Sequence, residues 1–155
     1  MVQANQDEPE SLVKAFQGAN VIFAVTDFWS PMYDPYNYAK LRPGQTINEF
    51  CYELELQRGK NIACAAAVIG TLDRFIFSSL PNISKITHGK YPHVYHFDSK
   101  AKIMEYIQET LPELSEKTSE LQLGEFATNW KIWKVRRPNK ASINGWKVSS
   151  TTALF

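Results

Sequence analysis

The sequence predicts an α/β domain with a parallel sheet of about four strands flanked by helices. Two short, largely apolar stretches carry this prediction, residues 21–25 and residues 75–81, and turn residues bound each of them. Segments with a helical pattern alternate with these stretches, and such alternation is typical of a parallel sheet. Because parallel sheets are covered on both sides, we expect residues 21–25 to be buried on both faces.

At the amino end, the sequence predicts a short strand over residues 2–4, followed by a helix that ends at Gly18. Pro9 and the acidic residues around it suit the first turn of that helix, where they complement the positive end of its dipole. Gly18 suits the helix end. We expect residues 2–4 to pair directly beside residues 21–25, because an uncovered edge strand would expose unpaired backbone groups.

The middle of the chain combines a loop and a long helix. Residues 30–45 contain three prolines and three tyrosines, and a loop of this length is often functional. Thr46 or Asn48 then caps a helix that runs to about Ile69. The apolar face expected for this helix consists of Phe50, Leu54, Ile62, Ala65, Ala66 and Ile69.

The second half of the chain continues the alternation and then changes in composition. We expect a helix over residues 98–109 and a last strand within residues 121–126. From residue 131 onward, basic and aromatic side chains are mixed with very few acidic ones. Such a mixture can bind nucleic acid, but a solvated tail is the simpler interpretation. We therefore divide the chain into a domain over residues 1–130 and a poorly ordered tail over residues 131–155.

Composition argues against several classes of protein. The 17 basic and 16 acidic residues nearly cancel, so no strong field favours nucleic acid or an anionic membrane. The apolar runs are far shorter than the roughly 20 residues that cross a membrane, and the first residues show no secretory pattern. Cys51 and Cys64 lack the spacing of metal ligands, so we expect reduced thiols, no metal and a protein of the cytoplasm or the nucleus.

A ligand site is expected where the two main strands end. Ligands of open parallel sheets bind just beyond the carboxyl ends of the strands. Thr26, Asp27 and Phe28 follow the first strand, and two serines end the second. The sequence therefore predicts that these residues lie at the edge of a site.

Four stretches of the sequence resemble the NmrA-like family, whose members are atypical extended short-chain dehydrogenases/reductases. These stretches are residues 2–12, 18–29, 75–81 and 96–100, and the last is the most specific. The resemblance extends over about residues 2–130. It implies a partial Rossmann-type domain that binds NADP, often without ordinary dehydrogenase chemistry.

The resemblance also implies which residues contact the cofactor. The positions that match the family are Asn5 and Gln6 beside the adenine; Thr26, Asp27 and Phe28 along its middle; Lys60 in the long helix; Lys100 at the nicotinamide ribose; and Phe126, Ala127, Thr128 and Asn129 beside the nicotinamide. Asn5 stands where the family usually has aspartate, a change that an amide tolerates because it both donates and accepts hydrogen bonds.

One departure from the wider group concerns catalysis. Its standard members have Tyr-x-x-x-Lys, whereas here His96 precedes Lys100 by four residues, a replacement typical of the NmrA-like branch. Histidine exchanges a proton near neutral pH, so the candidate catalytic residues are His96, Lys100 and Ser78. The neighbouring Tyr95 projects about 100° away around a helix and is not a ready substitute.

The second departure concerns the phosphates of the cofactor. The seven glycines form no Gly-x-Gly-x-x-Gly turn, which in Rossmann domains binds the diphosphate at a helix N-terminus. We therefore expect a domain that lacks its first βαβ unit and is truncated at both ends. Three lost charged hydrogen bonds of about 1.5–3 kcal/mol each would reduce NADP binding to the millimolar range or weaker.

Three functions remain open at this point. The chain is an NADP-dependent oxidoreductase of fungal type, a non-catalytic redox-sensing regulator that binds a protein such as a transcription factor, or an inactive remnant. An exposed sheet edge would in addition favour association with a protein partner or a second copy. The substrate is not readable from the sequence.

Overall fold

The computed structural model describes residues 2–124, 138–142 and 145–148 of the chain. The chain forms two compact units, Met1–Gln122 and Leu123–Phe155. The second unit contains an antiparallel hairpin of strands β4 (Pro138–Ser142) and β5 (Gly145–Val148). The first unit holds every candidate site residue whose structure is described.

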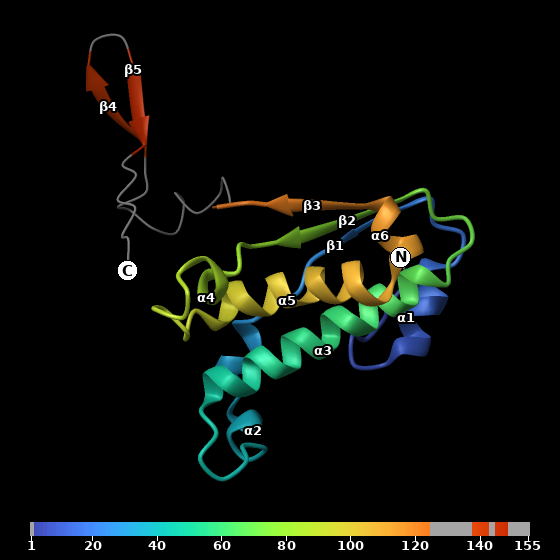
Figure 1. The fold of residues 1–155 in the computed structure, drawn as a ribbon, viewed down its shortest axis with the longest axis horizontal. Helices are drawn as coiled ribbons and strands as arrows, with labels where there is room; N and C mark the ends of the chain where they lie inside the picture. Colours follow the sequence, from blue (N-terminus) through green and yellow to red (C-terminus); the bar gives the residue numbers. More distant parts are fainter. Residues whose placement is uncertain (1, 125–137, 143–144, 149–155) are drawn as a thin grey trace. The chain divides into compact units, whose positions relative to one another are not determined.

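The first unit is an α/β fold built on a parallel sheet (Figure 1). Its strands are β1 (Val21–Ala24), β2 (Arg74–Ser79) and β3 (Thr118–Gln122), in the order β1-β2-β3. Both pairs are parallel, so the two main predicted strands lie side by side as expected. This architecture is that of a partial Rossmann-like fold.

The predicted pairing of residues 2–4 with β1 is wrong. These residues form no strand, and β1 is an edge strand among the residues described. The segment after them is instead tied to helix α3. Arg58 forms a two-bonded ion pair with Asp7, and the side-chain amide of Asn61 donates to the backbone carbonyl of Gln6 at 2.9 Å. The sheet therefore has three strands in this unit, not four.

The helices that carry the fold are α1 (Pro9–Phe16), α3 (Ile47–Ala67), α5 (Tyr95–Thr110) and α6 (Pro112–Lys117). Thr46 begins α3 with a capping box: its hydroxyl accepts from the backbone of Glu49, whose carboxylate accepts from the backbone of Thr46. No helix in the described part of the chain has both the length and the apolar character to cross a membrane.

The expected loop over residues 30–45 contains short helices, and so does the segment after β2. Residues 30–45 include η1 (Ser30–Tyr33) and α2 (Pro35–Tyr38), and α4 (Ile83–Ile86) follows β2. A side chain caps two of them: Asp34 accepts from the backbone of Tyr36, and Asn82 accepts from the backbone of Lys85. Such capping satisfies the backbone donors that a free helix start leaves unpaired.

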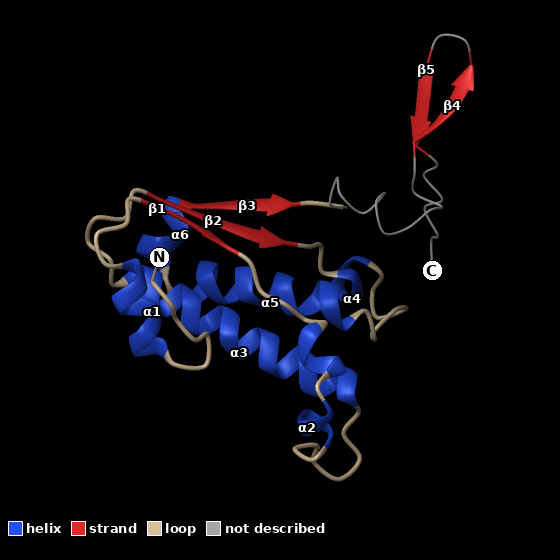
Figure 2. Cartoon of the chain, turned by 180° about the vertical axis from the view of Figure 1, so that it is seen from behind, coloured by secondary structure: helices blue, strands red, loops and turns tan. Residues whose placement is uncertain are grey.

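The prediction that residues 21–25 are buried on both faces is also wrong. Ile22 and Ala24 are buried, whereas Val21, Phe23 and Val25 are exposed. The reason is that α1, α3 and α5 all lie on one side of the sheet, as Figures 1 and 2 show from opposite directions. On the side of the sheet that the helices cover, Phe75 and Phe77 of β2 join Ile103 and Ile107 of α5 in the hydrophobic core.

The predicted apolar face of α3 is confirmed in its second half, where Ile62, Ala65 and Ala66 are buried, and Ile69 just after the helix is buried as well; its first half differs. Phe50 and Leu54 are only half-buried, and the buried stripe begins instead with Cys51, Glu55 and Gly59. A Cβ atom on Gly59 would lie 2.1 Å from Cδ1 of Ile103, so glycine is what lets α5 pack closely here. Both cysteines are free thiols, Cys51 buried and Cys64 half-buried.

Candidate functional site

Four polar residues form a buried network beyond the carboxyl end of β1, which we call the Lys100 cluster: Thr26, Glu55, Ser99 and Lys100. The ammonium Nζ of Lys100 lies 3.0 Å from the backbone carbonyl of Thr26, 3.1 Å from its hydroxyl, and in contact with Glu55 Oε1. The hydroxyls of Thr26 and Ser99 donate to the two carboxylate oxygens of Glu55. The cluster thus joins β1, α3 and α5.

The two charged side chains of this network are shielded from solvent. The side chain of Glu55 is 0% exposed and that of Lys100 is 13% exposed, so each charge depends on the other. Lys100 already donates toward three acceptors, and an ammonium has only three N–H groups. A ligand that bonds to Lys100 therefore replaces one of these partners.

His96 lies one helical turn before Lys100, among aromatic rings. Its ring centroid is 4.9 Å from that of Trp29, 5.8 Å from that of Phe28 and 4.8 Å from that of Phe97. Burial lowers the pKa of His96 below its usual value; the charge of Lys100 adds to this, and the carboxylate of Glu55 opposes it. The imidazole is consequently neutral at physiological pH and can accept a proton but seldom donate one.

Asp27 and Phe28 have structural partners of their own. The Asp27 carboxylate accepts from the backbone N–H of Trp29 at 2.8 Å and from both the backbone and the hydroxyl of Ser30. Burial alone would raise the pKa of Asp27, but the bonds from Ser30 and Trp29 and the charge of Lys100 lower it overall. Phe28 is buried with its ring edge against Trp29. Both residues lie beside the cluster and shape its rim.

Ser78 is buried, and it faces the side of β2 opposite to that of its neighbour Ser79. Register pairs Ser78 with Leu121 and places it, like Ile76, on the face of β2 turned away from the helices. The next residue, Ser79, is almost fully buried, and its hydroxyl lies 3.5 Å from the backbone carbonyl of Lys100. Ser79, not Ser78, therefore faces α5.

Among the described residues, Asn5 and Lys60 make their contacts outside the Lys100 cluster. Asn5 bonds to Glu8 and to the backbone of Asp7 near the start of α1. The ammonium of Lys60 lies 4.9 Å from the ring centroid of Tyr106. Phe126, Ala127, Thr128 and Asn129 lie outside the described residues.

Sequence reasoning missed Glu55 and Ser99. A detectable signal was present for Glu55: with Cys51, Gly59 and Ala63 it forms an i, i+4 series of otherwise small residues. A carboxylate within such a stripe is buried only if a cation faces it. Assigning the apolar face to Phe50 and Leu54 hid this requirement.

A comparison of the sequence with known protein families agrees with this fold. The NmrA-like family matches residues 1–131 of the chain. The chain belongs to the NmrA-like family. Membership implies an NAD(P)-binding type of fold, and the three-stranded parallel sheet agrees with that assignment. The NmrA-like match also includes every residue of the Lys100 cluster.

The residues present suit one end of a dinucleotide better than the other. If a sugar hydroxyl displaces one of its three acceptors, Lys100 can donate to that hydroxyl, and the Thr26 carbonyl can accept from it. Glu55 is 0% exposed and bonded on both oxygens, so it acts on the ligand only through Lys100. A glycine-rich turn for the diphosphate does not occur in the sequence. The cluster therefore fits the ribose part of an NAD(P) cofactor, and the fit to its phosphates is poor.

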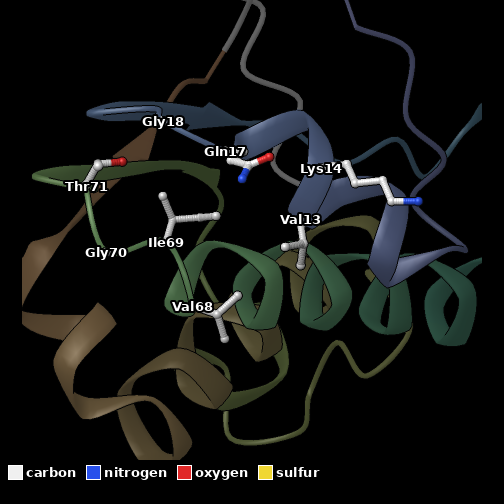
Figure 3. Close-up of a pocket in the computed structure, with 8 residues that line it drawn as sticks. All are labelled: Val13, Lys14, Gln17, Gly18, Val68, Ile69, Gly70 and Thr71. Atoms are coloured by element: carbon white, nitrogen blue, oxygen red, sulfur yellow. The ribbon is translucent and has the colours of Figure 1, made fainter.

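A separate pocket lies at the opposite edge of the sheet. Figure 3 shows it between the end of α1 and the end of α3, with Val13, Gly18, Ile69 and Thr71 on its walls. Its volume is about 480 Å³. Gly18 precedes β1 and Thr71 precedes β2, so this pocket is at the amino ends of the strands and does not include the Lys100 cluster.

Proposed function

We propose that this chain binds NADP(H) at the carboxyl edge of its sheet, with the sugar next to the nicotinamide at the Lys100 cluster. One observation carries the proposal: the Lys100 ammonium is fixed against the Thr26 carbonyl, just past the end of β1, where ligands of open parallel sheets bind. The affinity is expected in the millimolar range, because the sequence has no glycine-rich phosphate turn.

The test is an NMR titration of the chain with NADP⁺ and, separately, NAD⁺. The amide signals of Thr26, Glu55 and Lys100 are expected to shift progressively with NADP⁺. The variant Glu55→Gln/Lys100→Met removes both charges at once and should abolish these shifts. Lys102→Met, on the same helix but bonded to Glu105 outside the cluster, is the matched control and should shift like the unmodified chain. Loss of the shifts in the control, or their persistence in the double variant, would contradict the proposal.

Within this proposal, we favour binding without efficient hydride transfer. When bound, NADP(H) would supply a hydride, and the protein would have to supply the proton. One helical turn before Lys100 lies the ring of His96, which is packed against Trp29, Phe28 and Phe97 and has a lowered pKa, so it is a poor source of that proton. Such an arrangement suits a redox-sensing regulator of the cytoplasm or nucleus that reports nucleotide binding to a protein partner, such as a transcription factor.

The second candidate is an NADP-dependent oxidoreductase, with His96 as proton acceptor, Lys100 at the ribose and Ser78 or Ser79 near the substrate. The position of His96, one helical turn before Lys100 on α5, favours it, since an imidazole at that place can take a proton from an alcohol. A spectroscopic assay of NADP⁺ reduction with a panel of alcohols separates the candidates. Turnover that His96→Phe abolishes would establish the enzyme, and its absence with intact binding would support the regulator.

A further inference from the structure

We propose that Trp29 is the stacking residue of the nucleotide site, and that its indole ring packs against the nicotinamide ring of the ligand. The inference rests on the proposed function, because it takes the ribose next to the nicotinamide to lie at Lys100. It extends the site beyond Thr26, Asp27 and Phe28, the positions after β1 that the sequence predicts to contact the cofactor.

The Trp29 side chain is held in place and yet remains open to solvent. Trp29 is 47% exposed, whereas its neighbour Phe28 is buried. The carboxylate of Asp27 accepts from the backbone N–H of Trp29 at 2.8 Å, and the Trp29 carbonyl accepts from the backbone N–H of Met32 at 3.0 Å. A ring on an ordered backbone loses little conformational freedom when a ligand packs against it. Trp29 therefore offers a prepared surface for a flat ring.

Two ring contacts place the indole next to α5. The ring centroid of Trp29 lies 4.9 Å from that of His96, with the planes tilted by 49°, and 5.1 Å from that of Phe28 in an edge-to-face arrangement. His96 precedes Lys100 by about one turn of α5. Lys100 in turn donates to the carbonyl of Thr26, which precedes Trp29 closely in the chain. The indole and the ammonium are therefore at the same end of the sheet.

The covalent structure of the ligand suits this placement. In a nicotinamide nucleotide the pyridine ring is bonded directly to the ribose, so a sugar held at Lys100 brings that ring to the immediate neighbourhood of His96 and Trp29. Aromatic side chains stack on heterocyclic bases largely regardless of the substituents of the base. The adenine lies at the other end of the dinucleotide, beyond the two phosphates, so the nicotinamide is the ring expected on Trp29.

This arrangement predicts which half of the nucleotide supplies the affinity. The sequence has no glycine-rich turn for the diphosphate, so the sugar and the stacked ring contribute most of the binding free energy. Nicotinamide mononucleotide carries that sugar and that ring and should bind nearly as tightly as NADP⁺. AMP carries adenine in place of the nicotinamide and should bind more weakly.

NMR of the full chain tests the proposal, because each tryptophan gives its own indole N–H signal. The signal of Trp29, assigned with Trp29→Phe, is expected to shift progressively with nicotinamide mononucleotide and much less with AMP. Trp29→Leu should weaken the binding of nicotinamide mononucleotide about tenfold, a usual loss when an aromatic stacking partner is removed, as measured at the amide of Lys100. Tyr36→Leu, which removes an exposed aromatic ring from α2, is the matched control and should bind like the unmodified chain.

The results separate this inference from the proposed function. If the Lys100 amide shifts with NADP⁺ but the Trp29 indole does not, stacking on Trp29 is refuted and the site at Lys100 remains. Equal affinity of Trp29→Leu and the unmodified chain leads to the same conclusion. If AMP shifts the indole and nicotinamide mononucleotide does not, the nicotinamide assignment is wrong. Absence of any shift at Lys100 with NADP⁺ overturns the proposed function and this inference with it. The indole signal is measured in the unmodified chain, so this test does not depend on the folding of a variant.

Discussion

Glu55 on α3 and Lys100 on α5 form an ion pair that is closed to solvent on the carboxylate side. The carboxylate also accepts from Thr26 and Ser99, so it has hydrogen bonds on both oxygens. Because the partners come from three elements, one pair fixes the relation of both helices to the sheet at its ligand-binding edge. The same contacts that define the candidate site therefore also stabilise the fold.

Removing one member of the Glu55–Lys100 pair is expected to lower the free energy of unfolding much more than removing both. Glu55→Ala leaves a largely buried ammonium without its counter-charge, which costs about 3–5 kcal/mol of unfolding free energy. Glu55→Leu/Lys100→Met replaces the pair by apolar side chains and should recover most of that loss. Urea denaturation of both variants measures the difference. Equal destabilisation by the single and the double variant would show that the pairing of these two charges does not determine the stability of the fold.

Gly59 is expected to be intolerant of any side chain. A methyl group there would lie within 2.1–3.0 Å of three carbons of the buried Ile103, so Gly59→Ala should destabilise by about 1–3 kcal/mol through overpacking. Adding Ile103→Val should recover part of it by removing Cδ1. Gly70→Ala is the control, because open space surrounds that position. Thermal denaturation of the three variants checks the order, and a neutral Gly59→Ala would refute the close packing of α3 and α5.

His96 should make stability depend on pH in a defined direction. Its pKa in the folded protein lies below the unfolded value of about 6.5, since burial disfavours the imidazolium. The unfolded chain therefore binds more protons between these two values, and stability is lost as the pH falls from about 6.5 through the folded pKa. His96→Phe should flatten this part of the profile in urea denaturation at stepped pH. An unchanged profile would mean that His96 is not the titrating group.

The N-terminal segment is expected to depend on the ion pair between Asp7 and Arg58 of α3. The guanidinium of Arg58 holds Asp7 by two hydrogen bonds of 2.8 and 2.7 Å and keeps the pKa of that carboxyl below its usual value. Asp7→Asn should therefore speed hydrogen exchange in residues 5–8, while exchange in β2 stays slow. Glu10→Gln, which changes an exposed carboxylate of the same segment, is the control.

Local sequence patterns predicted some elements of this fold correctly and missed others. The runs that became β1 and β2, and the long helix after Thr46, follow from local patterns of apolar residues and caps. The pairing of residues 2–4 failed because it assumed that a strand must cover β1, whereas Asp7 ties the segment that follows them to Arg58 of α3, and Asn5 accepts from the backbone of Asp7. Glu55 was missed because its partner is 45 residues away in the sequence, and because the apolar face of α3 was assigned to Phe50 and Leu54, not to the small-residue series around Glu55.

The central claim is that a nucleotide sugar binds at Lys100. The most direct measurement is a crystal structure of the chain soaked with NADP⁺ at millimolar concentration. The account predicts ribose hydroxyls within hydrogen-bonding distance of Lys100 Nζ, with the contact to Glu55 or Thr26 exchanged for the ligand. A nucleotide found instead in the pocket beside Gly18 and Thr71, with the Lys100 cluster unchanged, would contradict it.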